Sequence, residues 1–423
     1  MGSMIHLTLG RIELDWGQND GFVDHRALFR PSDLTEIPYF YAGDIEEAQY
    51  AHLPIIRKSE DFSYRLITEI KEGYSSPLSV VAERLELLGY VDGYCREEFQ
   101  ALFHEEFANH DFTFDELKSI LQSADFSGAA FDPKLGSEDF AEFIAGRILP
   151  RIAPTAARRL RHNSMDNGQV DGLSAYSILR LLSANPTARR LPVTWQFADV
   201  AEDGYVKRDR LLAPVPQENR FLIVTEGSSD TQIIKHALKL LRPEVADFFD
   251  FVDMHENYPF SGTGNLYNFV RGLMSIRIQN NIVVMFDNDA EGVFNWERSR
   301  KLNQLVNLRI VKLPDRERFR NFRTAGPSGE LTADINGKAA AIECYLDLGP
   351  TPIVRWTNYE HRRGSYQGHI LRKEELAKEF LAQRVLVTGY DYSGLEAVLN
   401  TLIRECSSIR EEALMASLQD ELL

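Results

Sequence analysis

The feature that most constrains this chain is an alternation of short apolar runs and helical stretches that starts at residue 221. The runs Phe221–Thr225 and 282–286 are rich in β-branched residues, which is typical of parallel strands that are buried on both faces. Successive strands are about 30 residues apart, as strand–helix–strand units require. The sequence predicts strands at 221–225, 249–254, 282–287 and 307–312, separated by helices at 229–241, 263–277 and 291–304.

Two of these predicted strands end in carboxylates that precede a glycine. Glu226-Gly227 follows the first strand, and Asp287 and Asp289 follow the third. Because ligands of parallel α/β sheets sit outside the carboxyl ends of the strands, we expect these three side chains to surround one point. Carboxylate oxygens with room for water are the ligands that Mg²⁺ or Mn²⁺ accepts. The sequence therefore predicts a metal-dependent phosphoryl-transfer site.

Three further acids are candidates for the same site, each with a structural alternative. Asp230 falls in the first turn of a predicted helix, where it could cap that helix or reach the metal. Glu291, like Asp289, also suits a helix N-terminus by its charge alone. Glu343 is expected on a helical stretch after the last strand, where it could complete a second metal site or simply be a solvated or salt-bridged helix residue.

A glycine pair and a lysine are weaker candidates for phosphate contacts. Gly262 and Gly264 precede a predicted helix between the two acidic strand ends. They could present backbone N–H groups to a phosphate, or form only a turn and a helix cap. Lys338 could neutralise charge on a phosphate, although most such lysines are surface residues.

Two strips combine basic and aromatic residues, at 316–323 and 359–369. Arginines pair with phosphates and aromatic rings stack on bases, so both strips are candidate nucleic-acid contacts. A solvated loop is the alternative in each case. The cations of interest are Arg316, Arg320, Arg362 and Arg363.

The composition sets limits on the class of protein. The 423 residues, 44% of them hydrophobic, suffice for two or three domains. No apolar run of about 18 residues and no signal peptide is visible, so we expect a cytoplasmic protein without membrane contacts. The three cysteines form neither a zinc pattern nor a disulfide framework. The net charge of −16 argues against non-specific adhesion to nucleic acid, but a local basic strip can still bind it.

The N-terminal half predicts a different architecture. Residues 4–57 alternate between short strands and turns, and the spacing changes to helical from about 60 to 150. A helix is expected near 170–184, and Asp203-Gly204 is expected to turn a hairpin between strands at 195–200 and 205–210. The predicted domains are a mainly helical α+β domain at 1–215 that begins with short strands, an α/β domain at 216–350, and a mostly helical extension at 351–423.

The acidic motifs resemble those of a Toprim domain, the catalytic fold shared by topoisomerases, bacterial primases, small RNA-maturation nucleases and OLD-type nucleases. Glu226-Gly227 resembles the glutamate motif of that family, and Asp287-x-Asp289 resembles its Asp-x-Asp motif. The resemblance covers about residues 219–313. It implies a Rossmann-like parallel sheet and Mg²⁺ or Mn²⁺ as cofactor. Asp230, Glu291 and Glu343 lie where the OLD-type branch carries extra acids.

The whole chain resembles prokaryotic proteins described as HEPN/Toprim-associated. The similar segments are 5–16 and 79–89 in the N-terminal domain and 251–265 in the Toprim region. The resemblance implies a role in anti-phage defence. HEPN ribonucleases use an Arg-x4-His motif that this chain lacks, since Arg158 or Arg159 with His162, and Arg363 with His369, have other spacings. The N-terminal domain is therefore expected to be structural, dimerising or partner-binding.

These observations predict a divalent-metal-dependent nuclease that acts on DNA or RNA. Glu226 would be a general base or a metal ligand, and Asp287 and Asp289 would hold the metal. The alternative is a non-catalytic or autoinhibited Toprim module that works through a partner protein. The chain has no Gly-x4-Gly-Lys-Ser/Thr motif, so any ATP dependence would come from a partner ATPase or another defence-system protein. Homo-oligomers are compatible with the sequence.

Overall fold

The protein is described from a computed structural model in which the chain divides into two compact units. One comprises Met1–Pro216 with Ala413–Leu423, and the other comprises Gln217–Glu412. Each unit is described by itself. The structure describes residues 2–57, 63–103, 113–132, 135–143, 173–212, 215–252, 263–302, 305–327, 329–360 and 365–421.

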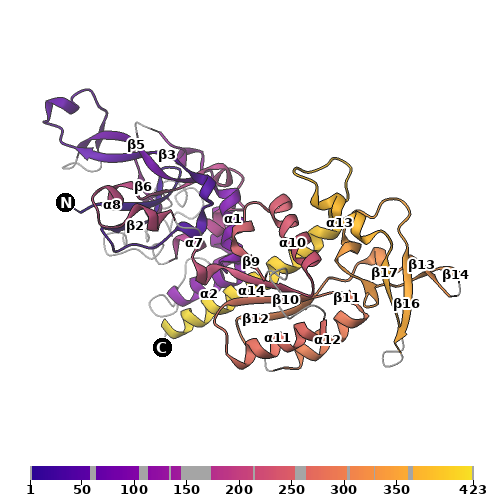
Figure 1. Ribbon diagram of the computed structural model, residues 1–423. Helices are drawn as coiled ribbons and strands as arrows, with labels where there is room; N and C mark the ends of the chain where they lie inside the picture. Colours follow the sequence, from indigo (N-terminus) through magenta and orange to yellow (C-terminus); the bar gives the residue numbers. More distant parts are fainter. Residues whose placement is uncertain are drawn as a thin grey trace. The chain divides into compact units, whose positions relative to one another are not determined.

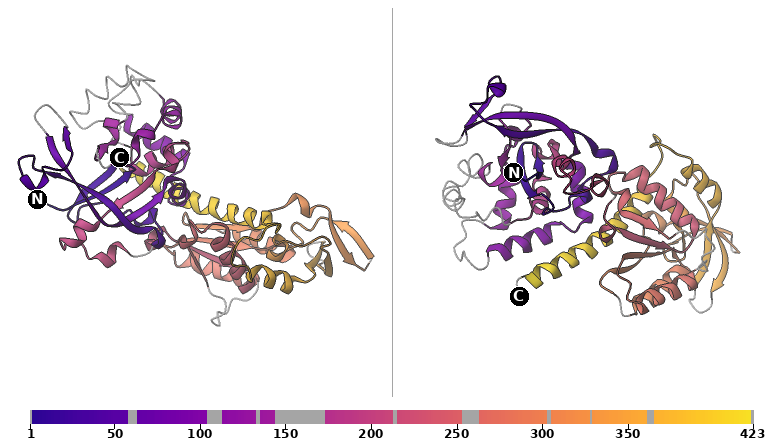
Figure 2. Two further views of the ribbon diagram at one scale, coloured as in Figure 1. Left: turned by 90° about the horizontal axis from the view of Figure 1, so that it is seen from above. Right: turned by 60° about the vertical axis from the view of Figure 1, so that its left-hand side comes forward.

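The first unit is built on a seven-stranded sheet (Figure 1). The strand order is β3-β5-β7-β1-β2-β6, and β4 pairs with β5. Figure 2 shows the twist of the long β3 and β5 strands from two further sides. The strands are β1 (Met4–Leu9), β2 (Ile12–Gln18), β3 (Leu34–Gly43), β4 (Ile55–Arg57), β5 (Ser63–Pro77), β6 (Glu138–Asp139) and β7 (Pro192–Gln196).

Helices pack against this sheet around a core of large aromatic side chains. Trp195 of β7 is completely buried and stacks on Tyr74 of β5, with ring centroids 6.2 Å apart. Helix α1 packs against β5 and α7. The helices described in this unit are α1 (Leu78–Leu87), α2 (Asp92–Phe103), α3 (Phe114–Ser123), α4 (Phe140–Phe143), α7 (Ala175–Leu182), α8 (Ala198–Glu202) and α9 (Arg208–Leu211).

The prediction that this unit is mostly helical was wrong. Helical spacing was expected from about residue 60, but β5 occupies Ser63–Pro77. Its pairing with β3 runs from Leu34 opposite Tyr74 to Gly43 opposite Arg65. Strand preference depends on neighbours across the sheet more than on local sequence, and here those neighbours lie some thirty residues away.

The predicted hairpin at Asp203-Gly204 was also wrong. The segment after β7 forms α8, and Gly204 ends that helix with a left-handed φ of +79°. Its N–H donates to the carbonyl of Ala201, and the Tyr205 N–H donates to the carbonyl of Val200. This is the Schellman arrangement that closes helices on glycine. The glycine therefore marks a helix end and not a hairpin.

The second unit contains a four-stranded sheet in which every pair is parallel. Its strands are β8 (Phe221–Thr225), β9 (Phe249–Phe251), β10 (Asn281–Phe286) and β12 (Leu308–Lys312), in the order β12-β10-β8-β9. These bounds agree closely with the sequence prediction. Parallel strands buried on both faces have continuous apolar runs, which is the pattern of residues 282–286.

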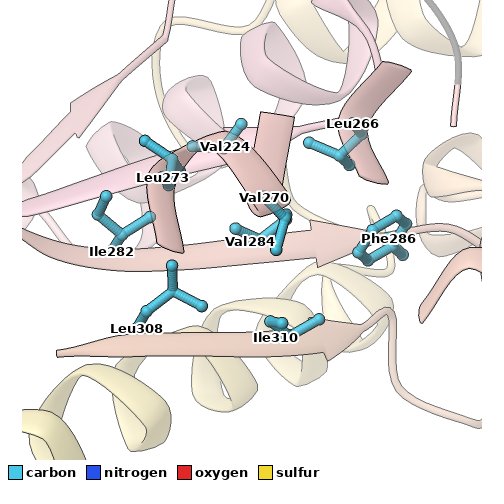
Figure 3. Close-up of a cluster of buried hydrophobic side chains, with 9 residues drawn as sticks. All are labelled: Val224, Leu266, Val270, Leu273, Ile282, Val284, Phe286, Leu308 and Ile310. Atoms are coloured by element: carbon cyan, nitrogen blue, oxygen red, sulfur yellow. The ribbon is translucent and has the colours of Figure 1, made fainter. Parts of the chain in front are cut away.

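Helices cover both faces of this sheet. Helix α11 (Thr263–Ser275) places Leu266, Val270 and Leu273 at helical spacing on one face, and α10 (Ser228–Leu241) contacts β8 from the other (Figure 1). Helix α12 (Ala290–Arg300) packs beside α11. Figure 3 shows the resulting core of Val224, Leu266, Val270, Leu273, Ile282, Val284, Phe286, Leu308 and Ile310.

The strand order determines where a ligand site can form. From β8 the chain passes to β9 on one side, and it then crosses to β10 on the other side of β8. The carboxyl ends of β8 and β10 therefore border the point at which the winding direction reverses. In open α/β sheets, ligands bind at this switch point because the two following loops separate there and leave a crevice.

The remainder of this unit adds two small sheets and two helices. Strands β11 (Asn288–Asp289) and β15 (Ala339–Ala340) pair antiparallel. A second four-stranded sheet has the order β14-β13-β16-β17, with β13 (Phe322–Gly326), β14 (Gly329–Ala333), β16 (Val354–Glu360) and β17 (Ser365–Ile370). Helices α13 (Lys373–Leu381) and α14 (Ser393–Glu421) follow.

The region after residue 351 contains the two helices expected there, α13 and α14, and the β16–β17 hairpin precedes them. Glu343 lies in a short 3-10 turn, Ile342–Tyr345, and not on an α-helix. Among the residues that the structure describes, no helix is both long and apolar enough to cross a membrane.

Candidate acidic active site

Glu226 and Asp287 are brought together by the parallel pairing of β8 and β10. Thr225 lies beside Met285 in the strand register, so the next residues leave the sheet side by side. The Asp287 backbone N–H donates a hydrogen bond of 3.0 Å to Oε1 of Glu226. Both side chains are partly exposed. Two carboxylates are thus fixed at the switch point of the sheet, with access to solvent.

Gly292, in the first turn of α12, packs directly against this pair. A Cβ at this position would lie 2.3 Å from the carbonyl oxygen of Asp287 and 2.9 Å from Oε1 of Glu226. A residue without a side chain is needed here because the helix backbone approaches both groups closely. Gly292 was not among the predicted site residues, although its position after Asp287-Asn-Asp-Ala-Glu291 offered a signal.

Asp230 and Asp289 both act at helix N-termini. Oδ2 of Asp230 accepts a 2.9 Å hydrogen bond from the Gly227 N–H at the start of α10. Oδ1 of Asp289 accepts hydrogen bonds from the Glu291 and Gly292 N–H groups at 3.0 and 2.7 Å, as the N-cap of α12. The capping alternative therefore holds for both, and these contacts also fix the position of their carboxylates.

The pairing of β11 with β15 brings Glu343 close to the other acids. Asn288 lies opposite Ala340 in this register, and the chain then turns through Ile342–Tyr345. The Glu343 side chain is buried, and its Oε1 lies 3.6 Å from Nζ of Lys373. Lys373 opens α13 and is half exposed. This lysine could not be predicted from the sequence, because its partner is distant in the chain.

The electrostatics of these side chains show that they share one environment. Burial, followed by the charges of Asp289, Asp230 and Glu291, raises the pKa of Glu226 to about 8. Burial and the charge of Glu343 raise the pKa of Asp230 to about 7. The pKa of Asp287 is raised well above its usual value by burial and by four neighbouring carboxylates. We call Glu226, Asp230, Asp287, Asp289, Glu291 and Glu343 the acidic cluster.

Asn288 fixes the backbone of the cluster between Asp287 and Asp289. It is fully buried, and its Nδ2 donates to Oδ1 of Asp315 at 2.9 Å. Its Oδ1 accepts from the Gly337 N–H at 2.9 Å and from Nζ of Lys312 at 3.1 Å. No sequence signal indicates this role of Asn288, since every partner lies on another element.

The weaker phosphate candidates have different surroundings. Lys338 is bridged to Asp289 through the backbone, which places it next to the acidic cluster. Gly264 lies in the first turn of α11 and is exposed, with no atom within 4 Å of a Cβ built there. Gly262 lies outside the described residues.

The first basic strip is largely occupied by contacts within its own unit. The Arg316 guanidinium donates to the carbonyl and hydroxyl oxygens of Ser393 at 2.8 and 3.0 Å. Phe319 and Phe322 are buried, so their rings cannot stack on bases. Arg320 is 64% exposed and lies 3.2 Å from Glu317. In the second strip, Arg362 and Arg363 lie outside the described residues.

The chemistry of the acidic cluster fits a hard divalent cation. Its side-chain donors are all carboxylate oxygens, which suits Mg²⁺ or Mn²⁺, and their mutual repulsion would be relieved by a cation. Within the described parts of the chain, no three His, Cys, Asp or Glu side chains are already gathered as a metal-ligand group. A metal would therefore require these carboxylates to turn toward one another.

Comparison with known proteins gives one result for the first half of the chain. Residues 1–219 match the family described as HEPN/Toprim N-terminal domain 1. Comparisons with curated proteins and with solved structures found no significant match. The match spans more than half of the 423 residues. The chain therefore belongs to the HEPN/Toprim N-terminal domain 1 family.

Proposed function

We propose that this protein is a divalent-metal-dependent nuclease whose catalytic site is the acidic cluster of a Toprim domain. The observation that carries the proposal is the junction of Glu226 and Asp287 at the switch point of a parallel sheet. Membership of a family named for its association with Toprim domains supports it. The likeness of Glu226-Gly227 and Asp287-x-Asp289 to Toprim motifs also supports the nuclease proposal.

Each residue would have a distinct part in phosphodiester hydrolysis. Asp287 and Asp289 would hold one ion, and Asp230, Glu291 and Glu343 would support a second. A bound ion supplies Lewis-acid polarisation of the phosphate and an activated water. Because Oε1 of Glu226 accepts the Asp287 N–H, its Oε2 is the atom available to a ligand or a proton. A carboxyl with a pKa of about 8 can exchange a proton near neutral pH.

A non-catalytic or autoinhibited Toprim module is the second candidate function. Two contacts favour it, because they give cluster members a purely structural explanation. Asp289 caps α12 through two N–H groups, and Glu343 pairs with the Lys373 ammonium. In such a module a partner protein would perform the reaction, and the acids would serve folding or regulation.

A cleavage assay separates the two candidates. Purified protein is incubated with supercoiled plasmid, linear DNA, single-stranded DNA and total RNA, in Mg²⁺, Mn²⁺ or EDTA. Glu226→Gln and Asp287→Asn are tested beside Glu297→Gln, an exposed carboxylate on α12 outside the cluster. The nuclease proposal expects metal-dependent cleavage that both cluster variants lose and Glu297→Gln keeps. Cleavage that survives both cluster variants, or its absence on every substrate, contradicts it.

We further propose that the protein acts in the prokaryotic cytoplasm as an effector of anti-phage defence. The family match supports this proposal only through the resemblance to HEPN/Toprim-associated proteins. The chain lacks a nucleotide-hydrolysis motif, so a partner ATPase or another defence protein would supply any ATP dependence. Homo-oligomers are compatible with this proposal. Plaque assays with a strain that carries the intact gene, and one that carries Asp287→Asn, test the role. Equal plaque numbers on both strains would count against it.

A further inference from the structure

A cationic cleft lies on the second unit, apart from the acidic cluster. It has a volume of about 480 Å³ and is bordered by α12, β12 and the part of α14 that belongs to this unit. The three elements are labelled in Figure 1. Four cations line it, accompanied by one acid, Glu405. The cations are Arg300, Arg309, Lys312 and Arg404.

The indole ring of Trp296 contacts two of these cations. Its indole N–H donates to the carbonyl of Ile310 at 3.2 Å, which fixes the ring against β12. The Arg300 guanidinium lies 4.9 Å and the Lys312 ammonium 5.8 Å from the ring centroid. The ring face is thus used to position cations. The cleft is therefore suited to phosphate groups and not to the stacking of bases.

Three of these four cations form ion pairs with nearby acids. Arg309 pairs with Glu412 at 2.5 Å, and Lys312 pairs with Asp315 at 2.6 Å. Arg404 is 70% exposed, and its contact with the adjacent Glu405 is 3.1 Å long. An ion pair with so exposed an arginine contributes little to stability, so a phosphate can compete for the Arg404 guanidinium. The cleft therefore gathers four cations in a chain whose net charge is −16.

Lys312 connects the cleft with the acidic cluster. It lies beside Phe286 in the parallel register of β10 and β12, one residue before Asp287. Its Nζ also donates to Oδ1 of Asn288 at 3.1 Å. Neighbouring strands are about 4.8 Å apart, so the cleft begins one strand away from the proposed reaction centre, at the same edge of the sheet.

We propose that this cleft holds the sugar-phosphate backbone of the nucleic-acid strand next to the phosphate that is cleaved. The inference rests on the proposed nuclease function and adds the direction in which the bound strand runs. The strand leaves the acidic cluster across the end of β12 and passes between α12 and α14. Because the contacts are to phosphates, binding in the cleft is independent of base sequence.

The test measures binding without cleavage, in EDTA. Short fluorescent single-stranded DNA and RNA of the same sequence are titrated with the intact chain, and anisotropy gives the Kd at several salt concentrations. The test variant is Arg300→Glu with Arg404→Glu, both exposed side chains. Arg384→Glu, an exposed arginine outside the cleft, is the matched control. Thermal unfolding of each variant verifies that the fold is retained.

The proposal expects the double variant to raise the Kd roughly tenfold or more, and Arg384→Glu to leave it within about twofold. The slope of log K against log salt should fall by about 1.4, or about 0.7 for each lost phosphate contact. Equal effects of the double variant and the control overturn the inference. The inference is also overturned if the double variant no longer binds inorganic phosphate or a free nucleotide but still binds the oligonucleotide with an unchanged Kd.

The outcomes also distinguish this inference from the proposed function. If the cleft variants weaken binding but no substrate is ever cleaved, the cleft is a strand-binding site and the nuclease proposal fails. If the cleft variants bind normally and metal-dependent cleavage persists, the nuclease proposal stands and the cleft proposal fails.

Discussion

At the scale of single residues, the account depends on charges that the fold holds close together. Glu226 lies near Asp289, Asp230 and Glu291, and burial adds to their effect on its pKa. Like charges that share a partly desolvated site favour protonation or cation binding. Structural acids usually have a lowered pKa because they pair with cations, so the raised pKa values of Glu226, Asp230 and Asp287 are typical of functional sites.

The first residue-scale prediction concerns stability against pH in EDTA. The pKa of Glu226 is about 8 in the folded protein and near 4.5 without its surroundings. Between these values the folded state binds more protons than the unfolded state, so the free energy of unfolding falls as pH rises from about 4.5 to 8. Glu226→Gln should remove this contribution and raise Tm near pH 8.5, by roughly 2–4 °C for each kcal/mol of destabilisation that is removed.

The measurement is thermal unfolding across this pH range, with Glu297→Gln as the control. The variant and the unchanged protein should converge below about pH 3.5, where Glu226 is protonated in both states. A Glu226→Gln protein that is less stable than the unchanged protein at pH 8.5 would show that the ionised carboxylate is stabilising, contrary to this account.

The second residue-scale prediction concerns Gly292. Gly292→Ala should destabilise the protein by about 1–3 kcal/mol, because the new Cβ meets the Asp287 carbonyl and the Glu226 carboxylate. Gly264→Ala is the matched control, since it also lies in the first turn of a helix but has open space around it. Chemical denaturation measures both. Equal stability of the two variants would refute the close packing at Gly292.

At the scale of elements, helix termini place two members of the acidic cluster. Asp289 is the N-cap of α12, and Asp230 accepts an N–H at the start of α10. Each helix also presents the positive end of its dipole to the carboxylates, which stabilises them in the absence of a metal. Capping and metal binding are thus compatible roles of the same side chain, and substitution can separate them.

The element-scale prediction separates these roles at Asp289. Asp289→Asn keeps an oxygen that can cap α12, so it should change the free energy of unfolding by only a few tenths of a kcal/mol. Asp289→Ala should cost about 1 kcal/mol. Both should lose metal-dependent cleavage, because neither carries a carboxylate. Full activity in Asp289→Asn, measured beside a stability close to that of the unchanged protein, would mean that Asp289 only caps the helix.

The elements also show what local sequence can predict. The parallel strands and their helices followed from apolar runs and helical spacing, and β8 has the predicted bounds, Phe221–Thr225. Strand β5 was missed because its partner, β3, is remote in the chain. Gly204 was assigned to a hairpin because glycine serves helix ends and hairpins alike, and only the preceding α8 distinguishes them.

At the scale of the whole molecule, the sequence located the acids but not the contacts that organise them. Glu226 and Asp287 could be placed together because parallel strands end at one edge of a sheet. Lys373, Asn288 and Gly292 could not, because their roles come from contacts between separate elements. Glu343 reaches the cluster only through the pairing of β11 with β15.

Metal binding by the whole chain tests the central claim most directly, because it needs neither a substrate nor a partner protein. Mn²⁺ is titrated into the metal-free protein at pH 8 by isothermal titration calorimetry, with Asp287→Asn, Glu226→Gln and the control Glu297→Gln. The account predicts that the unchanged protein and the control bind Mn²⁺ with the same Kd, and that each cluster variant binds at least about tenfold more weakly, a loss of 1.4 kcal/mol or more. Binding that is equal in all four proteins, or absent in all four, would contradict it.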